Sequence, residues 1–272
     1  MIEIANEELA VTLLHANQDR HLLGSRYCAG GYIFQIEDVK LGPLLSGPTY
    51  PERFDWYNGQ GIPDSFAATP LYPRRVEDPS VLILGVGLCK RDLSDVLRFD
   101  EWSVDVSNRS SVVYSVSHRI DDVEIRISRA VTLVERSVIS STTVTNVSEH
   151  QFTFSWFPHP FFPPPASAEL VRFSAPVSIP ESGPYELTAN GFISRNQALS
   201  AEGEYAALAH EAARGLTIMQ RHPELGLVVA QIDFVPTLLP IWGNDRTFSW
   251  EPHYDRSLAA GEASSWNISY HF

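Results

Sequence analysis

The sequence predicts an all-β protein in which two large antiparallel sheets pack face to face. Apolar residues recur at every second position over long stretches, as they do in half-buried strands. Helix patterns are few and short, and the 19 prolines concentrate in connecting segments. The chain has 272 residues, of which 44% are hydrophobic, and no shift in composition divides it. We therefore expect one large domain over residues 1–272.

The clearest alternation closes the chain. Over residues 265–272, aromatic and aliphatic side chains from Trp266 to Phe272 occupy every second position, and polar side chains fill the others. Between residues 98 and 157 the pattern predicts consecutive antiparallel strands joined by short polar turns, such as the one at Asp121-Asp122.

Two further stretches complete the predicted elements. Residues 131–147 are rich in Val, Ile, Thr and Ser, and Arg136 divides them into two predicted strands. Residues 205–214, YAALAHEAAR, are rich in alanine and are followed by Gly215. This composition favours one short helix.

Charge and composition exclude several classes of partner. The net charge of −13 disfavours binding to nucleic acid and to anionic membrane surfaces. No run of about 18 apolar residues predicts a membrane span, and the acidic N-terminal segment does not resemble a signal peptide. We therefore expect a cytoplasmic protein. Cys28 and Cys89 form no metal-binding pattern and are expected to be buried thiols, although one disulfide stays open.

The segment FSWFPHPFF, residues 154–162, places His159 between two prolines and among phenylalanines. Proline restricts the backbone on both sides, so the imidazole is expected on a rigid, aromatic-lined turn. Burial disfavours the charged imidazole, and a nearby carboxylate would favour it. His159 is therefore a candidate general acid, and the alternative is a structural histidine packed at a strand end.

Glu251 lies in the segment RTFSWEPHYDR, residues 246–256, directly after a predicted strand. A carboxylate in this position, beside Trp250 and near Tyr254, can project into a cleft of the size of a sugar. Glu251 is therefore a candidate general base. The alternative is an exposed glutamate at a strand end.

Four more side chains are candidate ligands for a sugar. Arg26, in GSRYCAGGYI, can donate paired hydrogen bonds to hydroxyl groups. Trp56 and Asp64 lie in the loop FDWYNGQGIPDSF, which combines aromatic faces with amide and carboxylate groups. Lys90 ends the apolar stretch ILGVGLCKR and is expected to face the same cleft.

Taken together and in this order, these segments resemble the galactose mutarotase-like superfamily, which includes the aldose 1-epimerases. The resemblance spans nearly the whole chain and is most telling in the closing segment, EPHY followed by LAAGE and WNISYHF. It implies an antiparallel β-supersandwich with few short helices and a sugar cleft across one sheet. It also implies that His159 is the general acid, Glu251 the general base and Arg26 a substrate ligand.

The sequence departs from this family at two places. Typical aldose epimerases carry a second histidine in a Leu-His-Gly-Gly-type segment, where this chain has Gln60-Gly61-Ile62-Pro63. The usual asparagine after the aromatic pair that follows the acid histidine is replaced by prolines, residues 163–165. The fold is thus better supported than galactose-specific activity.

Three functions fit these residues. The leading one is an aldose 1-epimerase that interconverts the anomers of a sugar or sugar phosphate by acid and base catalysis, with no metal and no organic cofactor. The second is a carbohydrate-binding protein of the same fold without turnover. The third is a polysaccharide lyase, which the short, acidic chain disfavours. We expect a monomer or a homodimer.

Overall fold

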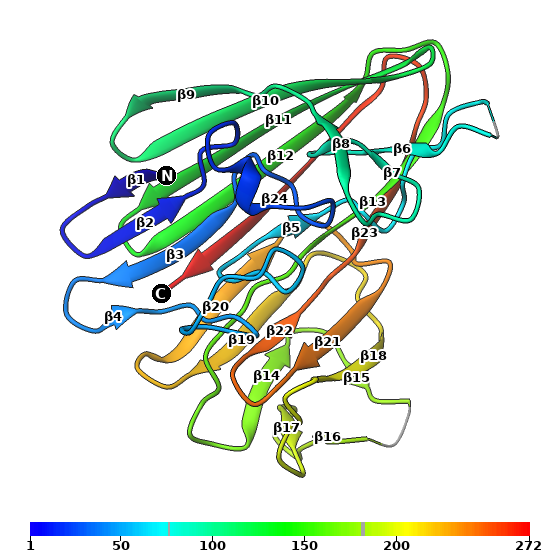
Figure 1. Cartoon of the computed structure of the whole chain (residues 1–272). Helices are drawn as coiled ribbons and strands as arrows, with labels where there is room; N and C mark the ends of the chain where they lie inside the picture. The colour runs from blue at the N-terminus through cyan, green and yellow to red at the C-terminus, as the bar shows by residue number, and fades with distance from the viewer. Residues whose placement is uncertain (76, 181–182) are drawn as a thin grey trace.

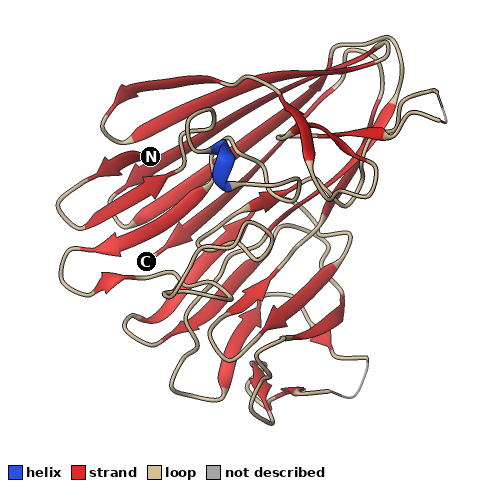
Figure 2. Cartoon of the chain, in the orientation of Figure 1, coloured by secondary structure: helices blue, strands red, loops and turns tan. Residues whose placement is uncertain are grey.

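The computed structural model describes residues 1–75, 77–180 and 183–272 and confirms the all-β class (Figures 1 and 2). Within these residues the one helix is a short 3-10 helix at Arg20–Leu22. None of the described helical structure is long and apolar enough to cross a membrane. Cys28 and Cys89 are free and buried, as expected.

The largest layer is a ten-stranded antiparallel sheet. Its longest strands come from the consecutive segment predicted between residues 98 and 157, and the turn at Asp121-Asp122 joins two of them. In spatial order the strands are β16 (Tyr185–Leu187), β17 (Ile193–Arg195), β14 (Glu169–Phe173), β19 (Thr217–His222), β20 (Gly226–Ile232), β24 (Ala263–His271), β12 (Ser137–Asn146), β11 (Val123–Val134), β10 (Ser111–Ile120) and β9 (Ser103–Asn108).

The second layer corrects the expectation of two large sheets, because four smaller sheets form it. Their strands are short, and proline-rich connections interrupt them. These sheets are β1 (Ile2–Ala5), β2 (Leu9–Leu13), β3 (Ile33–Asp38) and β4 (Gly42–Pro43); β6 (Ser80–Ile83), β7 (Gly87–Lys90) and β8 (Val96–Phe99); β23 (Tyr254–Leu258), β13 (Phe152–Pro158) and β5 (Asp64–Ser65); and β15 (Val177–Ser178), β18 (Glu204–His210), β21 (Leu239–Gly243) and β22 (Phe248–Trp250).

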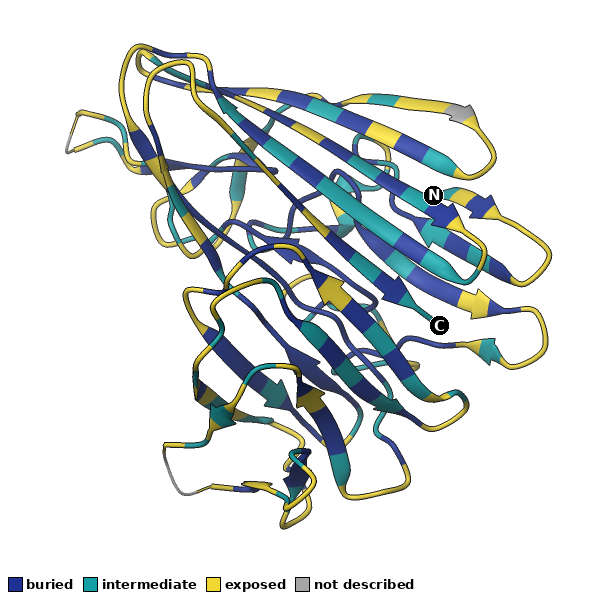
Figure 3. Ribbon diagram, turned by 180° about the vertical axis from the view of Figure 1, so that it is seen from behind, coloured by how far each residue is buried: buried dark blue, intermediate teal, exposed yellow. Residues whose placement is uncertain are grey.

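An aromatic core fills the space between the layers. Trp266 on β24 projects from the ten-stranded sheet, and its ring centroid lies 5.1 Å from that of Trp156 on β13. Phe154, two residues earlier on β13, stacks on the same indole at 5.7 Å. On the long strands, buried positions alternate with exposed or half-buried ones, as period-two alternation predicts (Figure 3).

The helix predicted over residues 205–214 is wrong, because Glu204–His210 forms strand β18. Pairing with β21 on one side and β15 on the other supplies the backbone hydrogen bonds that a helix would have made internally. Tertiary context thus overrides the helix propensity of alanine. As a consequence, the side chain of Tyr205 projects from a sheet beside β21.

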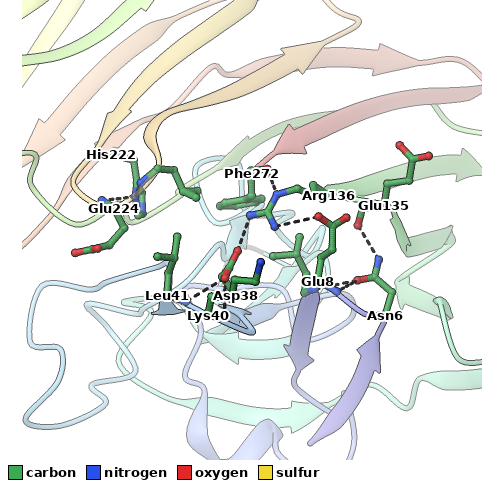
Figure 4. Close-up of polar contacts among 12 residues, drawn as sticks. Asn6, Glu8, Asp38, Lys40, Leu41, Glu135, Arg136, His222, Glu224 and Phe272 are labelled. Atoms are coloured by element: carbon green, nitrogen blue, oxygen red, sulfur yellow. Dashed lines mark hydrogen bonds and ion pairs between the residues drawn. The ribbon is translucent and has the colours of Figure 1, made fainter.

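Polar contacts fasten the N-terminal sheet to the ten-stranded sheet (Figure 4). Arg136, in the turn between β11 and β12, donates to the Asp38 carboxylate at 2.7 Å and to the Phe272 carbonyl at 2.7 Å. Asn6 donates to the carbonyl of Glu135 in the same turn at 2.7 Å. The guanidinium holds the pKa of Asp38 below its usual value, so this carboxylate stays charged.

Candidate active site

The backbone around His159 is held by an extension of the β13–β5 ladder. The amide of His159 donates to the carbonyl of Pro63 at 2.8 Å, and the amide of Phe161 donates to Gly61 at 2.8 Å. Pro160 lies between them and has no amide hydrogen to satisfy. The imidazole stacks on Phe161 with ring centroids 4.3 Å apart. The aromatic-lined, rigid turn expected from the sequence is therefore present.

Glu251 follows strand β22, and its amide donates to the carbonyl of Pro240 at 2.9 Å. This contact continues the pairing between β21 and β22 beyond the end of the strand. The Oε1 atom of Glu251 lies 3.3 Å from Nε2 of His159. The structure therefore brings together two residues that are more than ninety positions apart in sequence. The side chain of Glu251 is 10% exposed and that of His159 is 5% exposed.

Arg26 lies at the same site and is held by aromatic rings. Its guanidinium carbon lies 4.6 Å from the ring centroid of Tyr57 and 5.1 Å from that of Tyr27. One guanidinium nitrogen donates to the carbonyl of Tyr57 at 2.7 Å. This arrangement combines cation–π contact with one backbone hydrogen bond. Within the described residues no other hydrogen bond engages the guanidinium, so its remaining donors can bind a ligand.

These groups line a cavity of about 350 Å³, a volume within the usual range for small-molecule sites. Its walls combine aromatic faces with charged and amide groups, which suits a ring that carries hydroxyl groups. The lining residues are Arg26, Pro48, Tyr57, Asn58, His159, Phe161, Glu202, Tyr205, Trp242 and Glu251.

Sequence reasoning missed several of these residues, above all Tyr205, Trp242 and Glu202. Tyr205 and Trp242 are direct partners across β18 and β21, and the helix prediction concealed this pairing. Gly203, with φ of +90°, lies so close to Trp242 that an added Cβ would stand 2.2 Å from the indole. Only glycine allows the backbone beside Glu202 to approach the indole in this conformation.

Burial dominates the electrostatics of the pair. It raises the pKa of Glu251 to about 7, although the positive charge of Arg26 opposes this rise. Burial lowers the pKa of His159 well below its usual value, and the charge of Arg26 lowers it further. Both directions favour the uncharged forms of the two groups. Two groups this close titrate as a unit, so the protonation state belongs to the pair.

The structure does not bring Asp64, Trp56 or Lys90 into this cavity. Asp64 is buried on β5, where its carboxylate pairs with Arg129 from β11. A buried guanidinium needs such a counter-charge, which explains why this aspartate faces the interior. Trp56 lines a separate cavity of about 280 Å³, and the neighbouring Tyr57 reaches the site instead. Lys90 pairs with Asp95 at 3.2 Å on the exposed end of β7.

The segment that lacks the second histidine of typical aldose epimerases lies behind the site. Gln60 is buried, and its amide nitrogen lies 3.5 Å from the carbonyl of Phe34. Gln60 is not one of the residues that line the cavity. Among the described parts of the chain, no group of three or more His, Cys, Asp or Glu side chains is arranged to hold a metal ion.

Several solved structures share this fold over nearly the whole chain. A galactose mutarotase related enzyme from Lactobacillus acidophilus superposes with a TM-score of 0.62 at 11% identity, covering 99% of this chain and 96% of the other. A candidate aldose 1-epimerase from Escherichia coli K12 gives 0.61 at 17% identity, with 99% and 97% covered. An aldose epimerase homologue from C. elegans gives 0.52 at 14% identity, with 99% and 97% covered.

No protein-family description matches the chain, and no curated protein matches it. At these identities the structural likeness establishes the fold and leaves activity to the site itself. The chain therefore has the galactose mutarotase-like fold, as the resemblance of its motifs implies.

Proposed function

We propose that this protein interconverts the anomers of a sugar, as an aldose 1-epimerase does. The observation that carries the proposal is the 3.3 Å approach of His159 Nε2 to Glu251 Oε1 in the wall of the cavity. The anomeric hydroxyl oxygen and the ring oxygen are bonded to the same carbon. Two proton-exchanging atoms at this separation can therefore reach both oxygens.

In the proposed mechanism, the single proton of the pair first passes from Glu251 to Nε2 of His159. The Glu251 carboxylate then removes the proton of the anomeric hydroxyl, and the His159 imidazolium protonates the ring oxygen. The bond between the anomeric carbon and the ring oxygen breaks, and the open-chain aldehyde forms. After rotation about the bond between C1 and C2, the ring oxygen attacks the other face of the aldehyde. Glu251 then returns its proton to the carbonyl oxygen, and His159 recovers its own from the ring oxygen. The reaction is reversible, so each group acts in turn as acid and base.

The charges of the cavity favour a neutral sugar over a sugar phosphate. Arg26 is the one cationic side chain among the lining residues of the described chain, whereas Glu202 and Glu251 are acidic. Arg74 is not one of the lining residues and pairs with Asp122 at 2.6 Å. Phosphate recognition usually draws on more positive charge than a single arginine beside two carboxylates provides.

The test is anomer interconversion, followed by polarimetry or NMR with freshly dissolved neutral aldoses and their phosphates. The wild-type protein should accelerate mutarotation, and Glu251→Gln should lower the rate by about 10²- to 10⁴-fold. The matched control is Glu3→Gln, an exposed glutamate on β1, which should retain the full rate. An absence of protein-dependent mutarotation with all of these sugars would reject the proposal.

A carbohydrate-binding protein without turnover is the second candidate. The absence of the second histidine near Gln60 favours it, because an otherwise complete aromatic cavity can bind sugar without catalysis. Under this alternative, calorimetry would detect saturable sugar binding that survives Glu251→Gln, with no mutarotation by either protein. The lyase alternative has no supporting observation at the site, where a polyanionic polymer would meet two carboxylates and one arginine.

A further inference from the structure

Strand β22 and the residue that directly follows it contact both nitrogens of the His159 imidazole. Ser249 and Glu251 lie two positions apart, so their side chains project from the same face of the extended backbone. The Oγ atom of Ser249 lies 2.9 Å from Nδ1, and Oε1 of Glu251 lies 3.3 Å from Nε2. The imidazole is therefore held along the axis through its two nitrogens by a single segment of three residues.

The hydroxyl of Ser249 contacts Nδ1 of His159 and no other described polar group. Ser249 is fully buried, and in the described parts of the chain its side chain makes one hydrogen bond, the one to His159. It is not among the residues that line the cavity, so it does not touch a bound sugar. Phe161 stacks on one face of the imidazole and makes an apolar contact there. The polar contacts of the ring are made by its two nitrogens.

We propose that Ser249 is a positioning residue that accepts a hydrogen bond from Nδ1–H of His159 and so reserves Nε2 for proton exchange with the sugar. This inference deepens the proposed function and rests on it for its catalytic meaning. A neutral imidazole carries one N–H, at either nitrogen. If that hydrogen lay on Nε2, the nitrogen beside Glu251 would have no lone pair with which to accept a proton.

The same hydrogen bond serves both protonation states of the proposed cycle. When His159 is an imidazolium, Nδ1–H donates to Ser249 and Nε2–H is available to the ring oxygen. When Nε2 has given up its proton, Nδ1 keeps its hydrogen and the bond to Ser249 persists. A hydroxyl carries no charge, so unlike a carboxylate it orients the ring without strongly favouring the imidazolium.

The direct measurement is 15N NMR of the histidine side chains at neutral pH, because protonated and bare imidazole nitrogens differ widely in chemical shift. The signal of His159, one of 9 histidines, is assigned by its loss in His159→Gln. Wild-type protein should show a hydrogen on Nδ1 and none on Nε2. In Ser249→Ala the population should shift toward Nε2–H, and Ser249→Thr, which keeps the hydroxyl, should restore the wild-type pattern.

Kinetics provides the second measurement. Ser249→Ala should lower kcat by about 10- to 100-fold, the effect typical of metal-bound histidines that lose an orienting partner, and leave KM unchanged. The matched control is Ser155→Ala, which removes a buried hydroxyl lying 3.5 Å from Nδ1 of His253 and should change neither kcat nor the His159 signals. Circular dichroism confirms folding of each variant.

The outcomes separate this inference from the proposed function. A wild-type His159 that carries its hydrogen on Nε2, or a signal that Ser249→Ala leaves unchanged, overturns the role of Ser249 even if the protein is an epimerase. An Nδ1–H signal that depends on Ser249 supports the positioning role even if no mutarotation is found, in which case only the proposed reaction is rejected.

Discussion

His159 and Glu251 face each other across 3.3 Å, although each is delivered by a different sheet of the second layer. His159 extends the ladder of β13 with β5, and Glu251 extends that of β22 with β21. A backbone bridge between Phe162 and Phe248 joins the two ladders. The separation of the pair is therefore set by backbone pairing, which is more rigid than a loop.

The first prediction concerns pH. Glu251 has a pKa raised to about 7, and the pKa of His159 lies well below its usual value, both chiefly because of burial. At a pH between the pKa of His159 and that of Glu251, the pair holds a single proton, which the proposed mechanism requires. The ratio kcat/KM should therefore be highest in this window and fall as pH rises through about 7. A rate that keeps rising well above pH 7 would contradict the assignment.

The second prediction concerns Arg26, whose charge lowers the pKa of both groups in the pair. In Arg26→Met both pKa values should rise, so both limbs of the pH profile should move to higher pH. Loss of charged hydrogen-bond donors, which contribute about 1.5–3 kcal/mol, should also raise KM by about 10- to 100-fold. The exposed Arg109→Met is the control and should alter neither property. A pH profile of kcat/KM that does not shift in Arg26→Met would show that the charge of Arg26 does not change the pKa of either His159 or Glu251.

The third prediction concerns the buried pair of Asp64 and Arg129. Asp64→Asn leaves a buried guanidinium without its counter-charge, so the free energy of unfolding should fall by about 3–5 kcal/mol, measured by urea denaturation. In the control Asp95→Asn, which breaks the exposed pair with Lys90, the free energy of unfolding should fall by only about 0–1 kcal/mol. Equal effects of the two substitutions would contradict the structural role of Asp64. Sugar affinity of the folded Asp64→Asn protein should be retained.

The fourth prediction concerns the glycine beside the cavity. Gly203→Ala places a Cβ against Trp242 and also strains a backbone with positive φ, which costs about 1–2 kcal/mol. The shifted indole should weaken sugar binding, measured by calorimetry and tryptophan fluorescence. Gly226→Ala is the matched control, because Gly226 has φ of +73° and no atom within 4 Å of the added Cβ. Gly226→Ala should lower the free energy of unfolding through backbone strain and leave sugar binding unchanged. Equal sugar affinity in the two variants would show that Gly203 does not control the position of Trp242 for sugar binding.

The sequence by itself determined the class of the fold and the two central residues of the candidate site. Period-two alternation, as at Trp266 and Ile268, reports the two faces of a strand directly, because successive side chains point to opposite faces. His159 and Glu251 were found because each sits beside proline and aromatic residues at the end of a predicted strand.

The tertiary structure decided which other side chains join them. Asp64 and Trp56 lie in a polar, aromatic loop whose composition suits a sugar, yet the fold turns Asp64 toward Arg129 and Trp56 into another cavity. Tyr205 enters the site only because β18 pairs with β21, a contact between distant segments that outweighs local helix propensity. Local patterns specify which way a strand faces, whereas the neighbours of a side chain depend on pairings between segments far apart in sequence.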